Sequence, residues 1–309
     1  MRRATKSTLR VCWCSCSLRG RRLKSNYSHA FVVAAASTHD QEHNHVQGGY
    51  SSAEEQGPSK NLDRSLELSR EQIDRILRRN ERTVLVDKGA VHSYESNQLG
   101  ANAPCEDQYA EAACRLTAGQ LFGLFDGHGG GGCSRAVAAR LFDFVSVALL
   151  PPALLAQLTA ALDQPRTVRR SLQLAFDAMD TAICADALPD TRGKLGARAR
   201  VTTAAVSMCL AYYHWARVAT AAAGSCGLLA HLRGRNLHVA NTGDSCAVLA
   251  VSGESGAWTA RRLNTEHCIH NAAEVKRVRA EHPVGENASV LKGGRLLGEL
   301  FPLRAFGNV

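Results

Sequence analysis

The sequence predicts a protein of the α+β class, because helical periodicity and strand patterns fill separate stretches of the chain. Apolar residues recur every three to four positions in two segments, at residues 133–150 and 168–185. Short β-prone runs separated by turn residues follow later in the chain, at about residues 225–233, 236–241 and 246–252. This succession of strands and turns indicates an antiparallel meander.

Capping residues and glycine turns mark further elements. The apolar spacing of residues 63–80 predicts an amphipathic helix, and Ser69 followed by Gln72 predicts a capping box for its second half. Residues 119–125 form a short apolar run, which predicts a buried strand that ends in a glycine turn. A further helix is expected from a capping asparagine, Asn271, to Glu281.

The net charge of +9 is concentrated in residues 1–39, which contain eight basic residues and no acid. Only +1 remains for the rest of the chain, which argues against a basic nucleic-acid-binding face. The Arg- and Ser-rich composition of residues 1–39 is typical of a mitochondrial transit peptide that forms a cationic amphipathic helix. A disordered basic tail is the alternative interpretation of the same composition.

The remainder of the chain divides into a linker and a globular domain. Residues 40–62 are polar and lack periodicity, which predicts a disordered linker before a domain at residues 63–309. No run of 18 apolar residues is present, so no transmembrane segment is expected. The 11 cysteines are odd in number and scattered, which favours reduced thiols over a disulfide framework.

Acidic residues in turn-like contexts suggest a metal site. Glu106 and Asp107 are adjacent, Asp126 follows the apolar run in Asp-Gly-His-Gly-Gly, and Asp244 lies in Thr-Gly-Asp-Ser. A carboxylate at the end of a buried strand is costly unless it is neutralised, and Mg²⁺ or Mn²⁺ prefers such oxygen ligands. Each acid alone also fits an ordinary turn, so the metal hypothesis requires that they meet in the fold.

The order of these motifs resembles that of the PPM family, protein phosphatase type 2C. The resemblance is carried by Glu106-Asp107, Phe125-Asp-Gly-His-Gly-Gly, Gly224-Ser, Val239-Ala-Asn-Thr-Gly-Asp-Ser and Arg304-Ala-Phe-Gly. Within the family, Ser96-Asn-Gln-Leu and Leu237-His-Val-Ala-Asn are similar to the branch that dephosphorylates pyruvate dehydrogenase.

The resemblance implies a β-sandwich flanked by helices, in α-β-β-α layers, with a two-metal centre for Mg²⁺ or Mn²⁺. Asp126 would bridge both ions, and the carbonyl of Gly127 would bind one of them. Glu106 and Asp107 would hold metal-bound waters, while Asp244 would lie near an additional, weaker ion.

Two further roles come from the resemblance. His128 would act with Asp126 in catalysis and would protonate the leaving serine alkoxide. Asn102 occupies the position at which many family members carry an arginine that binds the substrate phosphate.

The sequence also departs from the family pattern. Cys246 stands where an arginine usually follows Gly-Asp-Ser, and Asn308 stands where an aspartate usually follows Ala-Phe-Gly. Cys226 replaces a usual Thr or Ala, which we interpret as a mild change. The family's later metal-binding acids would follow Val309, so the fold is expected to be incomplete at its C-terminus.

The leading hypothesis is therefore a metal-dependent serine/threonine phosphatase of the mitochondrial matrix. Its expected partner is a phosphoprotein, the pyruvate dehydrogenase complex, with a possible regulatory subunit. The alternative is a pseudophosphatase or binding module that keeps the partner surface without hydrolysis.

Overall fold

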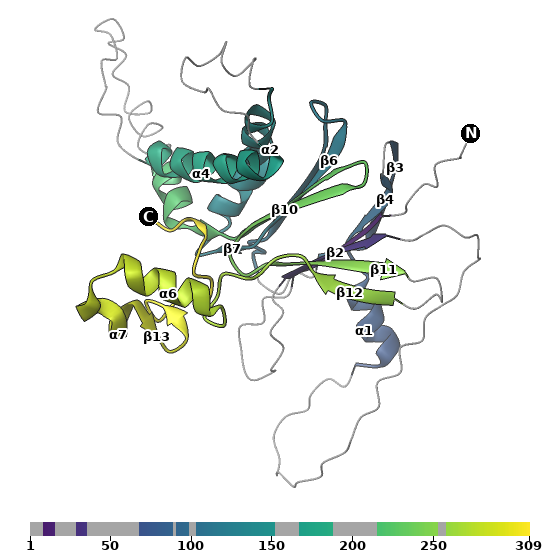
Figure 1. Ribbon diagram of the computed structural model, residues 1–309. Coiled ribbons are helices and arrows are strands. Elements are labelled where there is room, and N and C mark those ends of the chain that lie inside the picture. Colours follow the sequence, from purple (N-terminus) through teal and green to yellow (C-terminus); the bar gives the residue numbers. More distant parts are fainter. Residues whose placement is uncertain are drawn as a thin grey trace, which may run out of the picture.

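The computed structural model of the chain has a mixed α+β architecture, as predicted (Figure 1). It describes residues 9–15, 29–35, 68–88, 91–98, 103–151, 167–187, 215–252 and 258–309. The predicted linker at residues 40–62 and the predicted phosphate-binding residue Asn102 lie outside the described residues.

The central sheet is antiparallel and has the strand order β10-β9-β6-β5. Its strands are β5 (Gln108–Cys114), β6 (Gly119–Phe125), β9 (Gly227–Arg233) and β10 (Asn236–Thr242). The predicted strand at residues 119–125 is confirmed as β6, and all but one of its residues are buried. A strand covered on both faces reads as a continuous apolar run, which explains its sequence.

Two long helices cover one face of the central sheet (Figure 1). They are α2 (Gly132–Ala148) and α4 (Val168–Ala187), whose bounds lie within two residues of the predicted ones. Leu141 of α2, Met179 of α4 and Phe125 of β6 have no measurable exposure and belong to one apolar cluster. Burial of each such side chain contributes about 1.5–3 kcal/mol, so this layer is a main source of stability.

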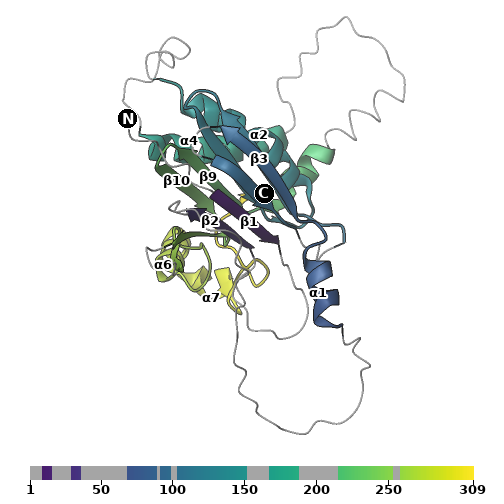
Figure 2. The same ribbon diagram turned by 90° about the vertical axis from the view of Figure 1, so that its right-hand side faces the viewer.

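A second layer of strands packs against the opposite face of the central sheet. It contains the hairpin β3 (Arg82–Lys88) and β4 (Val91–Ser96), and a sheet of order β1-β2-β11-β12. Tyr94 of β4 meets Phe122 of β6 edge to face, with ring centroids 5.5 Å apart. Figure 2 shows the two strand layers beside the helices. The two layers, with the apolar cluster between them, form the expected β-sandwich.

The predicted three-stranded meander is correct for its first connection and wrong for its second. β9 and β10 form an antiparallel hairpin around Gly234, whose positive φ of 56° suits the turn. β11 (Cys246–Ser252) instead crosses to the second sheet, where it pairs with β12 (Trp258–Arg262). The crossing brings Ala247 into the apolar cluster between the two sheets, a contact that strand patterns do not reveal.

The N-terminal region contains strands where a cationic helix was expected. β1 (Leu9–Ser15) and β2 (His29–Ala35) pair with each other, and β2 also pairs in parallel with β11. Both segments contain valine and aromatic residues, which favour strands, so the expected amphipathic helix is not formed here. The assignment of residues 1–39 as a transit peptide stays a prediction.

Local capping signals mark the N-termini of two helices, although the helix predicted over residues 63–80 begins only at its capping box, since residues 68 and 69 are not helical. α1 (Arg70–Leu77) begins with the expected capping box: Ser69 accepts from the backbone of Gln72, and Gln72 accepts in return from Ser69. α6 (Ala272–Glu281) begins at Asn271, whose side chain accepts from two backbone N–H groups.

The remaining short elements lie near the C-terminal end of the chain. They are η1 (Val284–Glu286), α7 (Asn287–Val290), β13 (Leu291–Lys292) and β14 (Arg295–Leu296). Val278, Val290 and Leu303 form a separate apolar cluster beneath them. Among the helices that the structure describes, none has both the length and the apolar character needed to cross a bilayer.

Candidate metal centre

A small three-stranded sheet contains the glycine turn that follows β6. It consists of β15 (Phe306–Gly307), β8 (Gly224–Ser225) and β7 (Gly127–His128), in that order. β7 follows β6 directly, so the residue between these two strands, Asp126, lies where the central sheet gives way to the small one. Likewise, Cys226 lies between β8 and β9, and its backbone N–H donates to the Asp126 carbonyl at 2.8 Å.

Asp244 approaches the same point from the turn that connects the two sheets. The preceding residue, Gly243, has a φ of 105° and is held from both sides. Its N–H donates to Nδ1 of His267 at 3.1 Å, and its carbonyl accepts from Nδ2 of Asn241 at 2.9 Å. These bonds fix the turn, so the Asp244 side chain has a defined direction into the site.

Asp126, Cys226 and Asp244 form a compact group of possible metal ligands. One donor atom from each lies within 4.8 Å of the other two. The Cys226 thiol donates to Oδ1 of Asp244 over 3.2 Å, and Cys226 is only 1% exposed. The sulfur of Cys226, the residue that the sequence analysis interprets as a mild replacement, therefore lies beside the two carboxylates that it selects.

Gly127 lies directly against the chain segment that carries Glu106. A Cβ atom at this position would overlap the Glu106 carbonyl and would lie 2.8 Å from Oγ of Ser134. The Ser134 hydroxyl donates to the same Glu106 carbonyl. A glycine is therefore required here by close packing of two backbone segments, and Glu106 lies beside the turn.

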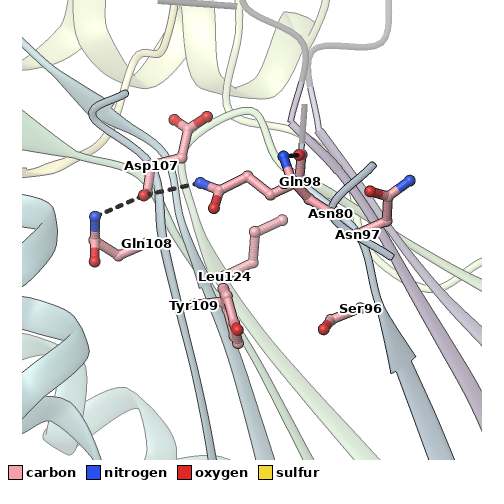
Figure 3. Close-up of a pocket in the computed structure, with 8 residues that line it drawn as sticks. All are labelled: Asn80, Ser96, Asn97, Gln98, Asp107, Gln108, Tyr109 and Leu124. Carbon is pink, nitrogen blue, oxygen red and sulfur yellow. Dashed lines mark hydrogen bonds between the residues drawn. The ribbon is translucent and has the colours of Figure 1, made fainter. Parts of the chain in front are cut away.

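Asp107 is placed next to Asp126 by the register of the central sheet. Gln108 pairs with Phe125 at the end of the antiparallel pair β5–β6. Asp107, just before Gln108, and Asp126, just after Phe125, therefore lie at the same end of the two strands. Asp107 is buried, and its carbonyl accepts from Nε2 of Gln98 at 3.1 Å. A pocket of about 210 Å³ opens beside it between β4 and β5, as Figure 3 shows.

His128 contacts the amide of Asn308, a residue that is 180 positions away in the sequence. Its Nε2 atom lies 3.2 Å from Oδ1 and 3.0 Å from Nδ2 of Asn308. An amide can accept from a protonated ring nitrogen or donate to an unprotonated one. Asn308 can therefore hold the imidazole in place while a proton is gained or lost.

The electrostatics of the site favour a bound cation. Burial and the nearby charges of Asp244 and Asp126 raise the pKa of the Cys226 thiol well above its ordinary value. Burial also raises the pKa of Glu266, with Arg262 opposing and Asp244 adding to the effect. Both groups therefore resist ionisation beside the carboxylate of Asp244, and a divalent cation would offset the carboxylate charge.

The residues fit a divalent metal centre in their donor chemistry. Two carboxylates from distant parts of the chain converge, and Gly127, the residue after Asp126, packs against the Glu106 carbonyl. Carboxylate and carbonyl oxygens are the donors that Mg²⁺ and Mn²⁺ prefer, whereas the Cys226 sulfur is a softer donor.

Comparison with known proteins identifies the fold family. A family model described as Protein phosphatase 2C matches residues 86–309. The chain belongs to the protein phosphatase 2C family. The matched residues include the central sheet, the two helices that cover it and every residue of the candidate metal centre.

The relatives of this chain include proteins named as mitochondrial pyruvate dehydrogenase phosphatases. It is 35% identical over 278 residues to "[Pyruvate dehydrogenase [acetyl-transferring]]-phosphatase 1, mitochondrial" of Rattus norvegicus, covering 78% of this chain and 52% of that protein. It is 30% identical over 294 residues to "[Pyruvate dehydrogenase [acetyl-transferring]]-phosphatase 2, mitochondrial" of Homo sapiens. This alignment covers 79% of this chain and 52% of that protein. The chain thus spans about half the length of these curated relatives.

Most residues that the sequence analysis selected as site residues gather at one end of the sandwich. Asp126 and Asp244 meet, Gly127 packs against Glu106, and His128 lies on the adjoining strand β7. Their roles in metal binding and catalysis stay predictions. Cys226 was missed, because only the β8–β9 junction, and no spacing in the sequence, places its sulfur near Asp244.

Proposed function

We propose that this chain is a metal-dependent protein serine/threonine phosphatase that hydrolyses phosphoserine on the pyruvate dehydrogenase complex. The observation that carries the proposal is the convergence of Asp126 and Asp244, 118 residues apart, beside His128. Membership of the protein phosphatase 2C family and similarity to pyruvate dehydrogenase phosphatases support it. We also place the chain in the mitochondrial matrix, where such a substrate would be found, and allow for a regulatory subunit.

In the proposed centre, Asp126 and Asp244 would hold Mg²⁺ or Mn²⁺ together with the Gly127 carbonyl. When bound, these cations would offset charge on the phosphoryl oxygens and lower the pKa of a coordinated water. Glu106 and Asp107, beside the turn, would orient water molecules around the ions.

His128 would act as the general acid. The P–O bond to the serine breaks as water attacks phosphorus, and the leaving oxygen takes a proton from the imidazole. Asn308, within 3.2 Å of Nε2, would keep the ring oriented during this transfer. A positioned acid of this kind contributes typically about 10²–10⁴-fold to the rate.

The test is phosphate release from a phosphoserine peptide with added Mg²⁺ or Mn²⁺, measured for the full chain. We expect metal-dependent release that Asp126→Asn abolishes. His128→Gln should slow the peptide by about 10²–10⁴-fold. The same variant should affect 4-nitrophenyl phosphate much less, because its phenolate leaves without protonation.

Two results would contradict the proposal. Equal rates for wild type and Asp126→Asn would show that the centre is not catalytic. Absence of release, with retained binding to pyruvate dehydrogenase, would support the pseudophosphatase or binding-module alternative.

A further inference from the structure

The thiol of Cys226 lies beside the candidate metal ligands and outside the apolar clusters of the described residues. Of the four other buried cysteines that the structure describes, Cys114 and Cys133 belong to the apolar cluster between the helices and the central sheet, whereas Cys246 and Cys268 belong to no such cluster. Cys226 belongs to none of the three apolar clusters formed by the described residues. Its sulfur instead lies with Asp126 and Asp244.

The position of this sulfur is fixed by the backbone on both sides. The N–H of Cys226 is bonded to the Asp126 carbonyl at 2.8 Å, which ties the two ligand-bearing residues together. A Cβ atom on Gly243 would overlap Sγ of Cys226, so the turn that carries Asp244 lies directly on the sulfur. The thiol therefore has little freedom to turn away from the two carboxylates.

The geometry matches one ion bound by sulfur and oxygen. Two ligands of a tetrahedral ion, with metal–sulfur near 2.3 Å and metal–oxygen near 2.1 Å, lie about 3.6 Å apart. The distance from Cys226 Sγ to Asp244 Oδ1 is 3.2 Å, and all three donors lie within 4.8 Å. Only small side-chain movements would bring all three donors onto one ion.

We propose that Cys226 is a metal ligand and that, with Asp126 and Asp244, it gives the centre a higher affinity for thiophilic divalent cations such as Zn²⁺ than the two carboxylates alone would give. This inference rests on one part of the proposed function, namely that Asp126 and Asp244 bind a metal ion. Sulfur is a poor ligand for Mg²⁺ and a good one for Zn²⁺ and Co²⁺. On binding, the thiol gives its proton to the buffer and the thiolate forms the metal–sulfur bond.

Cobalt titration tests the proposal, because a Co²⁺–thiolate bond absorbs in the near ultraviolet. The full chain would carry serines at Cys12, Cys14 and Cys16, so that the N-terminal thiols contribute no signal. We expect a charge-transfer band in this protein that disappears in Cys226→Ser. The matched control Cys184→Ser, on α4, should keep the band.

Zinc affinity supplies a second readout. Displacement of Co²⁺ by Zn²⁺ should show that Cys226→Ser binds Zn²⁺ at least about tenfold more weakly, since even outer-shell partners of a metal typically contribute 10–100-fold. Its affinity for Mg²⁺ should change little. X-ray absorption of the zinc-loaded protein should show sulfur at about 2.3 Å, a measurement that does not depend on folding of the variant.

The outcomes separate this inference from the proposed function. A band that survives in Cys226→Ser, cobalt binding without a band, or a zinc shell without sulfur would each overturn the assignment of Cys226. Phosphate release with Mg²⁺ alongside any of these results would leave the phosphatase proposal standing. A cobalt–sulfur band that needs Asp126, in a protein without phosphatase activity, would instead support the ligand and refute the activity.

Discussion

The close approach of Gly127 to Glu106 links the packing of single residues to the metal centre. The turn after β6 can approach the segment before β5 only because Gly127 has no side chain. The position of the turn that follows Asp126 thus depends on a contact between two backbone segments.

Gly127→Ala is expected to destabilise the protein by about 3 kcal/mol, the upper end of the range for overpacking. The added methyl group would overlap the Glu106 carbonyl, which belongs to the backbone and cannot rotate away. Urea unfolding followed by circular dichroism measures the change.

The matched control is Gly285→Ala. A Cβ atom at Gly285 would meet nothing within 4 Å, so this variant should stay within about 0.5 kcal/mol of the wild type. Equal effects of the two substitutions would show that the contact with Glu106 does not limit the turn.

Site residues could be predicted from the sequence where local chemistry marks them. Asp126 stands out because an acid follows an apolar run and precedes glycines, and Asp244 because it lies in a Gly-Asp-Ser turn. Cys226 and Asn308 carry no such mark. Their contacts with Asp244 and His128 arise from the small sheet of β7, β8 and β15, whose strands come from three distant parts of the chain.

At the level of elements, Glu274 joins helix α6 to the segment that leads to β15. It accepts from Nε of Arg304 at 2.7 Å and from Nε of Arg277 at 2.9 Å. Burial opposes ionisation of Glu274, but the hydrogen bonds from Arg304 and Arg277 more than offset it and lower its pKa to about 2. The ionised carboxylate therefore stabilises the folded protein.

Glu274→Gln should lower the free energy of unfolding by about 2 kcal/mol at pH 7, the typical contribution of hydrogen bonds to charged groups. Because the folded pKa lies below the ordinary value of 4.5, this stabilisation is complete above pH 4.5 and is lost as the pH falls towards 2. Denaturant unfolding of both proteins between pH 7 and 2.5 should show the difference shrinking over this window.

Glu281→Gln is the control, because Glu281 also pairs with Arg277 and its side chain is 58% exposed. Exposed pairs contribute about 0–1 kcal/mol, so this variant should be nearly as stable as the wild type. A Glu274→Gln deficit that stays constant from pH 7 to 2.5 would contradict the assigned pKa.

The predictability of the elements follows the range of the interactions that form them. The starts of α1 and α6 depend on hydrogen bonds across three residues, so Ser69 and Asn271 could be recognised in the sequence. The crossing of β11 to the second sheet depends on burial of Ala247 between sheets, and the pairing of β2 with β11 joins residues more than 200 positions apart. Neither leaves a local pattern.

At the scale of the whole molecule, the N-terminal strands complete one sheet of the sandwich. β2 lies between β1 and β11, so the edge of β11 is paired along residues 246–251. If residues 1–39 were cleaved as a transit peptide, that edge would lose its neighbour. Unpaired edges expose backbone donors and acceptors and promote association.

A chain that begins at residue 40 should therefore unfold with a free energy lower by about 1–2 kcal/mol, since cross-strand pairs contribute about 0.2–1 kcal/mol each. It should also self-associate at concentrations at which the full chain does not. Urea unfolding and analytical ultracentrifugation measure the two effects.

Removal of residues 1–7 alone provides the comparison, because it keeps both strands. This shorter deletion should leave stability and association unchanged. If the chain from residue 40 matched the full chain in both measurements, β1 and β2 would contribute nothing to the sandwich.

The pairing of β15 with β8 also has a practical consequence for anyone who handles this protein. The N–H groups of Asn308 and Val309 are bonded to the carbonyls of Ala223 and Ala221, and Asn308 touches His128. An affinity tag or fluorescent protein fused after Val309 would be separated by one residue from Asn308, which contacts the His128 imidazole. Its bulk could lower the measured activity in the same way as a substitution of His128 would. A small dye coupled at the same place would, for the same reason, be a sensitive reporter of ligands arriving there.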